Sequence, residues 1–166
     1  MQKTVVLIGL VVSLTACASP GDDARDKRYQ ANSPTMESTI AEGSTVTAKV
    51  VKPGEYQPGT GDVVMFDPPD SYGWNSDGRP RILRVVAVPG DTIACCDAQD
   101  RIIRNGTAQD EPYVNKASKF EPPAAFEPIT VPAGELYLLG DYRGVANDSS
   151  QNGTVPVENV IGIVKL

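Results

Sequence analysis

Histidine is absent from all 166 residues of the chain. Its absence excludes Ser-His-Asp and Cys-His catalytic groups, and it excludes metal sites built on imidazole. Basic residues are also few, 15 against 21 acidic ones, which gives a formal net charge of −6. This balance argues against a nucleic-acid partner, because phosphate contacts require lysine and arginine. We therefore expect no nucleic-acid partner, no metal and no other cofactor.

Aromatic residues make up only 6% of the chain, whereas it contains 15 glycines and 14 prolines. This composition favours a turn-rich β fold over a helical bundle, and no helix longer than about two turns is predicted. The alternation and β-branched content predict strands at 45–51, 62–66, 81–88, 135–139 and 160–164. Asn105-Gly106 after Ile102-Ile103 predicts a hairpin, and residues 67–80 and 116–128 are predicted loops. We expect an all-β fold of mainly antiparallel strands that is coiled or closed on itself.

The N-terminal segment is predicted to be a targeting signal rather than part of the folded domain. Lys3 precedes an apolar run, Val5–Val12, that is too short for a membrane-spanning helix and is typical of a secretory signal. Leu14-Thr15-Ala16-Cys17 resembles the lipobox of bacterial lipoproteins. The resemblance implies cleavage before Cys17, a lipid on its thiol, and an extracytoplasmic protein anchored to the cell membrane. The alternative is an ordinary signal peptide with a chance cysteine.

The expected domains follow from this reading. Residues 1–16 are the lipoprotein signal peptide, 17–32 the lipidated cysteine with a polar tether, and 33–166 the β domain.

Four segments in order carry a more specific resemblance. They are Ser33–Ile40 (SPTMESTI), Gly61–Val64 (GDVV), Arg84–Asp91 (RVVAVPGD), and Gly140–Arg143 (GDYR) with Asn147–Ser149 (NDS). Together they resemble type I signal peptidase, the membrane serine endopeptidase that removes signal peptides from secreted proteins. The stretch from Asp91 to Tyr113 resembles the actinobacterial branch. The resemblance implies the β fold of that catalytic domain, and it implies signal peptides or preproteins, extended and with small side chains, as partners.

The family's chemistry uses a serine hydroxyl and a lysine that burial keeps neutral. The resemblance places the nucleophile at Thr35, before Met36, and the general base at Leu83. The serine that orients the lysine falls on Ala146, whereas Ser33 matches the hydroxyl that stabilises the oxyanion. The surrounding motif residues are present, but both members of the catalytic dyad are substituted.

The family's charged positions near the site are matched by Arg84, Asp141, Arg143 and Asp148. Arg84 cannot replace the lysine, because a guanidinium stays protonated and its side chain points to the opposite face of the strand from residue 83. Another buried lysine near Thr35 would have to act as the base for the catalytic dyad to be restored.

The lysines on or near a predicted core strand are Lys49 and Lys52. Both lie beside a Pro-Gly turn and are expected to be solvated.

The sequence therefore predicts a lipid-anchored, signal-peptidase-like domain that is catalytically impaired. It could still bind preproteins or assist an active signal peptidase. One alternative is a working endopeptidase with Thr35 as nucleophile and an unrecognised base. Another is a structural or stress lipoprotein that kept only the fold.

Cys95 and Cys96 are neighbours in the sequence. On a strand their thiols would point to opposite faces, so free thiols are favoured over a vicinal disulfide.

Overall fold

The computed structural model describes residues 25–70, 78–114 and 126–166. The predicted signal peptide, Cys17 and most of the predicted tether lie outside the described residues. None of the helices in the described ranges is long and apolar enough to cross a membrane.

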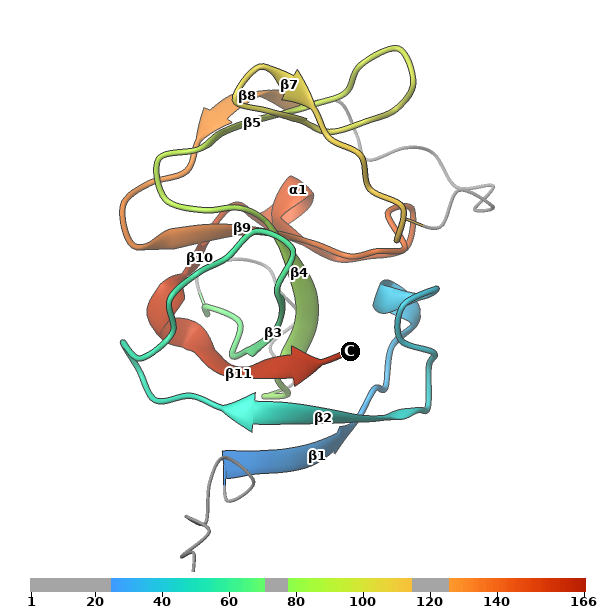
Figure 1. The fold of residues 1–166 in the computed structure, drawn as a ribbon, viewed down its shortest axis with the longest axis vertical. Coiled ribbons are helices and arrows are strands. Elements are labelled where there is room, and N and C mark those ends of the chain that lie inside the picture. Colours follow the sequence, from blue (N-terminus) through green and yellow to red (C-terminus); the bar gives the residue numbers. More distant parts are fainter. Residues whose placement is uncertain (1–24, 71–77, 115–125) are drawn as a thin grey trace, which may run out of the picture.

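The described chain is built almost wholly of strands (Figure 1). These are β1 (Asp26–Gln30), β2 (Thr45–Val50), β3 (Val63–Phe66), β4 (Arg81–Ala87), β5 (Thr92–Cys95), β6 (Ile103–Arg104), β7 (Thr107–Ala108), β8 (Phe126–Thr130), β9 (Glu135–Leu139), β10 (Val155–Pro156) and β11 (Val160–Lys165). The helices are short, namely η2 (Pro34–Met36), α1 (Ser149–Asn152) and η3 (Val157–Asn159).

The strands form two antiparallel sheets. The larger sheet has the order β1-β2-β11-β3-β4-β9-β10, and the smaller one has the order β7-β6-β5-β8. Every strand pair is antiparallel. In Figure 1 the smaller sheet lies above β9, and β1 and β2 lie at the opposite end of the molecule. The predicted all-β, mainly antiparallel fold class is confirmed.

Apolar burial explains why the central strands form. All four residues of β3 are buried, and five of the seven in β4 are. Strands that are covered on both faces become nearly continuous apolar runs. One core cluster lies within the larger sheet, and a second one joins the ends of β4 and β9 to β5 of the smaller sheet. The two central strands therefore hold both sheets together.

The predicted hairpin is present between β6 and β7. Asn105 and Gly106 have φ of 51° and 75°. Two successive positive φ values are what a two-residue hairpin turn requires, and asparagine and glycine tolerate them best. The Asn105 side chain also accepts a hydrogen bond from the Thr92 N–H at 2.8 Å, which ties the turn to β5.

Strands β1, β5, β8 and β10 were not predicted from the sequence. β1 lies inside the segment that was predicted to be a tether, so the folded part begins by residue 26 rather than at 33. Its sequence, DKRYQ, shows no apolar alternation because an edge strand covered on one side buries little. β8 begins within the predicted 116–128 loop, and its proline is tolerated because this strand too lies at a sheet edge.

Cys95 and Cys96 form a disulfide. The expectation of free thiols is therefore wrong. It assumed that one extended strand runs through both residues, whereas β5 ends at Cys95. Cys95 belongs to the second core cluster, and Cys96 packs against that cluster.

Candidate functional site

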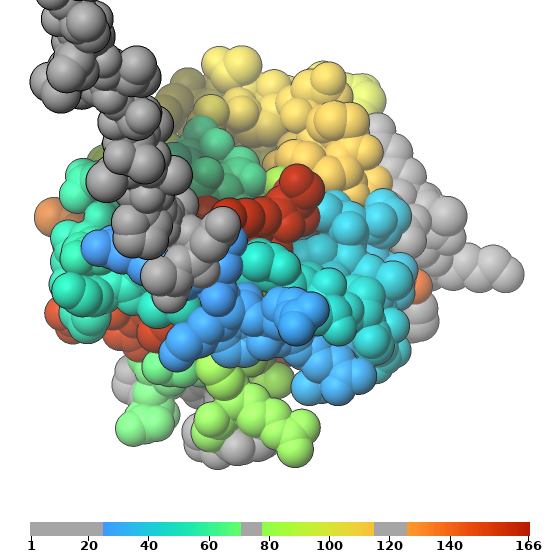
Figure 2. All heavy atoms as spheres, turned by 60° about the horizontal axis from the view of Figure 1, so that its bottom comes forward, coloured from blue at the N-terminus to red at the C-terminus, as the bar shows by residue number. Residues whose placement is uncertain are grey.

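A surface cavity of about 330 Å³ lies between the chain around η2 and the first half of β4. Its volume is within the range of ~300–1,000 Å³ that is common for ligand sites. Figure 2 shows the blue chain near residue 30 and the yellow-green chain near residue 80 meeting at this face. The lining residues come from three segments: Gln30, Ala31, Asn32, Ser33, Thr35, Met36 and Ile40; Arg79 to Leu83; and Val145 with Asn147.

Helix η2 presents Thr35 to the cavity. Ser33 is its N-cap, and its hydroxyl accepts a hydrogen bond from the Thr35 N–H at 3.4 Å. Pro34 suits the first helical position because its missing N–H has no partner there in any case. Met36 is 2% exposed and anchors this turn in the core. The hydroxyl of Ser33 and the amide of Thr35 therefore lie side by side at the cavity wall.

Leu83 closes the other side of the cavity. It lies in the middle of β4, opposite Val64, and is 1% exposed. Its side chain is held in the apolar setting in which a lysine amine would become a base, but it carries no group that can accept a proton.

Gly140 is the point around which three of the predicted positions meet. A Cβ on this glycine would lie 2.3 Å from Cβ of Ala146, 2.6 Å from the carbonyl oxygen of Thr35 and 3.5 Å from Cδ2 of Leu83. The carbonyl of Thr35 also accepts a hydrogen bond from the Tyr142 N–H at 3.0 Å. The structure thus brings together the positions matched to the nucleophile, the base and the base-orienting serine.

This close approach gives a first prediction. Gly140→Ala is expected to destabilise the fold by about 1–3 kcal/mol, because the added methyl group cannot be accommodated beside a backbone oxygen. Denaturant unfolding measures the loss. The G140A/A146G variant removes only one of the two clashes, so it should recover part of the stability. Equal unfolding midpoints for G140A and the wild type would contradict this packing.

No lysine in the described part of the chain lines the cavity. The side chain of Lys52 is 75% exposed and lies 3.9 Å from Glu55. Lys49 lies on β2 in register with Asp26 and Ile163, outside the cavity lining. The prediction that neither lysine rescues the dyad is therefore consistent with their positions.

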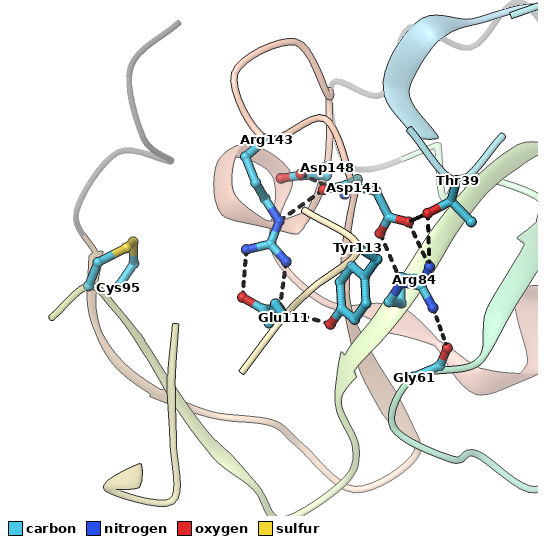
Figure 3. A network of polar contacts seen from close by, with 11 residues as sticks. Thr39, Gly61, Arg84, Cys95, Glu111, Tyr113, Asp141, Arg143 and Asp148 are labelled. Atoms are coloured by element: carbon cyan, nitrogen blue, oxygen red, sulfur yellow. Dashed lines mark hydrogen bonds and ion pairs between the residues drawn. A yellow bond between two sulfur atoms is a disulfide. The ribbon is translucent and has the colours of Figure 1, made fainter. Parts of the chain in front are cut away.

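Arg84 points away from the cavity, as the alternation of the strand predicts, and is 5% exposed. Its guanidinium donates to both carboxylate oxygens of Asp141, at 2.8 and 2.6 Å, and to the carbonyl of Gly61 at 2.8 Å (Figure 3). The hydroxyl of Thr39 donates to the same carboxylate. The ring of Tyr113 covers the guanidinium at 3.9 Å. This buried network joins the Gly61–Val64 and Gly140–Arg143 segments to β4.

Arg143 forms a second ion pair beside the first. It donates to Glu111 at 2.6 and 3.2 Å and to the carbonyl of Gly140 at 2.9 Å. The hydroxyl of Tyr113 donates to Glu111 at 2.9 Å. Burial, with a contribution from this carboxylate, raises the pKa of Tyr113, so the phenol stays neutral and remains a donor. Figure 3 shows that the two ion pairs share this tyrosine.

Asp148 is 1% exposed and caps α1. Its carboxylate accepts from the N–H of Ser150 at 3.0 Å and from the N–H of Gly140 at 3.1 Å. Burial raises the pKa of Asp148 above its ordinary value, although these hydrogen bonds oppose the shift. Asp148 thus fixes the backbone of the glycine around which the cavity residues meet.

The raised pKa of Asp148 gives a second prediction, in which Asp148→Asn serves as the reference. A carboxyl whose pKa is higher in the folded state binds protons preferentially there, so its contribution to stability falls as pH rises through that pKa. Relative to D148N, the wild-type protein should become more stable as the pH falls from neutral toward ~3.9, the unfolded value. D148N itself should lose about 1–3 kcal/mol, because one buried N–H loses its acceptor. Denaturant unfolding at several pH values tests both effects, and a difference that grows as pH rises would contradict the direction.

The structure places the predicted site residues in two groups. Ser33, Thr35, Met36 and Leu83 line the cavity, with Ala146 packed behind it. Arg84, Asp141, Arg143 and Asp148 form the buried support. Cys17 lies outside the described residues.

Sequence reasoning assigned no role to Glu111, Tyr113, Arg79, Arg81 and Val145. Arg81 begins the strand that also holds Leu83, two residues further on, so strand alternation could have placed Arg81 on the cavity face.

Comparison with known proteins identifies the family of the chain. The family model described as "Signal peptidase, peptidase S26" matches residues 4–166. The chain belongs to the peptidase S26 signal peptidase family.

Individual relatives support the assignment. The chain is similar to a probable signal peptidase I-1 of Synechocystis sp., at 31% identity over 134 residues, which are 78% of this chain and 64% of that protein. It is 32% identical over 136 residues to thylakoidal processing peptidase 1 of Arabidopsis thaliana, covering 78% of this chain and 38% of that protein. It is also 32% identical over 121 residues to signal peptidase I of Mycobacterium tuberculosis, covering 62% and 38%. The chain thus spans less than two thirds of the length of these relatives.

The fold is similar to the crystal structure of a signal peptidase I from Enterococcus faecalis. The TM-score is 0.55 at 27% sequence identity, and the match covers 66% of this chain and 98% of that one.

Proposed function

We propose that this protein binds extended peptides with small side chains, such as signal peptides of preproteins, in the cavity beside Thr35, and that it is impaired in cleaving them. One observation carries the proposal. The side chain at the position of the family's base is Leu83, which lines the cavity at 1% exposure, and the described lining contains no lysine.

The chemical argument for impairment is one of proton transfer. A hydroxyl becomes a useful nucleophile only when a base takes its proton. Loss of general-base catalysis costs roughly 10²–10⁴ in rate. Among the described residues of the lining, the charged side chains are Arg79 and Arg81, and guanidinium stays protonated in proteins. The methyl group of Thr35 also restricts its rotamers. The cavity is thus suited to holding a peptide rather than to attacking it.

The argument for binding rests on the shape and lining of the cavity. Ala31, Met36, Ile40 and Leu83 give it an apolar lining, and the polar groups of Ser33 and Thr35 stand at its wall. An extended peptide can add to such a site through its main chain, while small pockets select its side chains. An open cavity also disfavours the alternative of a lipoprotein that kept only the fold, because side chains would be expected to fill a groove that no longer binds peptide.

The resemblance of Leu14-Thr15-Ala16-Cys17 to a lipobox supports a location at the cell membrane. We propose that Cys17 carries a lipid, that the β domain lies outside the cytoplasm on the cell membrane, and that it acts beside an active signal peptidase. The resemblance of the stretch from Asp91 to Tyr113 supports an actinobacterial-type member.

Titration of the full chain with a synthetic signal peptide tests the binding function. Val145 is 36% exposed and lines the cavity, whereas Ile129 is 37% exposed and lies on β8, outside the lining. V145W should therefore block the peptide, and I129W should bind it like the wild type. The proposal fails if the wild-type protein shows no saturable binding, or if V145W and I129W bind equally well.

A further inference from the structure

We propose that the cavity beside Thr35 selects peptides that present a carboxylate to Arg79 and Arg81. This inference rests on the proposed peptide-binding function and adds a specificity to it. The carboxylate comes from either of two sources, namely an acidic side chain in the bound segment or the free C-terminus of an already cleaved peptide.

The charge of the cavity differs from that of the chain. The chain carries a formal net charge of −6, yet the charged side chains of the described lining are two arginines and no acid. The supporting acids Asp141 and Asp148 are 0% and 1% exposed, and each is held by its own hydrogen-bond partners behind the cavity wall. A ligand carboxylate would therefore meet positive charge at the cavity, in a molecule whose net charge would otherwise repel it.

The two arginines are positioned by the start of β4. Arg81 is the first residue of this strand and pairs with Phe66, and Leu83 follows two residues later. Residues two apart on a strand share a face and lie about 6.6 Å apart along it. Arg81 therefore lies on the same face as Leu83, one strand repeat away. An extended peptide laid along β4 has the same repeat, so a carboxylate about two residues from the small side chain beside Thr35 can reach this arginine.

Guanidinium chemistry suits this ligand. The planar guanidinium matches a carboxylate with two parallel hydrogen bonds. Arg79 and Arg81 each also interact with another group of the chain. Each guanidinium has five N–H donors, so an existing contact is compatible with a further one to a ligand. Gln30, Asn32 and Asn147 add amide groups to the same lining.

Binding by three small-residue peptides of one length to the full chain tests the proposal. The first has a free C-terminal carboxylate, the second has a C-terminal amide, and the third has the amide and an aspartate two residues from its central alanine. We expect at least one carboxylate peptide to bind about three- to tenfold more tightly than the neutral amide peptide. The preference should shrink as salt is raised. The peptide that shows it identifies the source of the carboxylate.

Variants assign the preference to the arginines. The R79Q/R81Q variant should bind the carboxylate and neutral peptides equally well. R28Q changes the same type of residue on the exposed face of β1, outside the lining, and should keep the preference. Equal binding of all three peptides to the wild-type protein would overturn this inference and leave the proposed function standing. A complete lack of peptide binding would instead remove the proposed function on which it rests.

Discussion

Restoring the dyad is expected to give the protein proteolytic activity. The T35S/L83K variant places a serine hydroxyl and an amine at two positions that both line the cavity and both lie against Gly140. Leu83 is 1% exposed, so an amine at this position would be desolvated and its pKa lowered, which produces a neutral base. We expect cleavage of a preprotein at least ~10²-fold faster than by the wild-type chain, with a rate that rises with pH as the amine loses its proton.

The matched control for this gain is T35S/L83M, which has the same nucleophile and a flexible apolar side chain without an amine. Unfolding curves of both variants establish that each is folded. Adding A146S, at the position of the orienting serine, should raise the rate further. The account is contradicted if folded T35S/L83K and folded T35S/L83M process the preprotein at the same rate.

The largest stability effect is expected from the buried pair Arg84–Asp141. Their side chains are 6% and 0% exposed, and the carboxylate is held by both the guanidinium and Thr39. Removing one partner leaves an uncompensated buried charge, which destabilises proteins by about 3–5 kcal/mol. R84M and D141L should each lose stability in this range in urea unfolding.

The double variant measures the interaction between Arg84 and Asp141 apart from the contacts that each makes with the rest of the protein. R84M/D141L removes both charges together, so its loss should be clearly smaller than the sum of the two single losses. K165M breaks the surface pair Lys165–Asp26, in which the lysine side chain is 49% exposed, and should cost at most ~1 kcal/mol. Additive losses for the buried pair, or single losses no larger than that of K165M, would contradict the structural role assigned to the network.

Much of the fold could be predicted because its core strands bury apolar side chains with a regular pattern. The β4 segment, RILRVVA, is such a case, and the hairpin at Asn105-Gly106 is another, since few residues tolerate its two positive φ values. β1 could not be predicted, because a polar edge strand is stabilised by its pairing with β2 rather than by its own sequence. The disulfide was missed for a similar reason, since it depends on where β5 ends.

The candidate site was predicted as a set of positions and not as a geometry. The order of the sequence boxes pointed to Thr35, Leu83 and Ala146, and only the fold shows that all three lie against Gly140. The support formed by Glu111 and Tyr113 required contacts between segments far apart in the sequence. The arginines of the cavity were missed because their relation to Thr35 depends on how η2 packs against β4.

Incubation of the purified wild-type chain with a preprotein tests the central claim most directly, since that claim is the lack of a proton acceptor beside Thr35. The reaction is followed by gel and by mass of the products, with T35A as the matched control. We predict that the wild-type protein and T35A release no mature product above the uncatalysed background. Processing by the wild-type protein that disappears in T35A would contradict the account, because it would show that a base deprotonates the Thr35 hydroxyl.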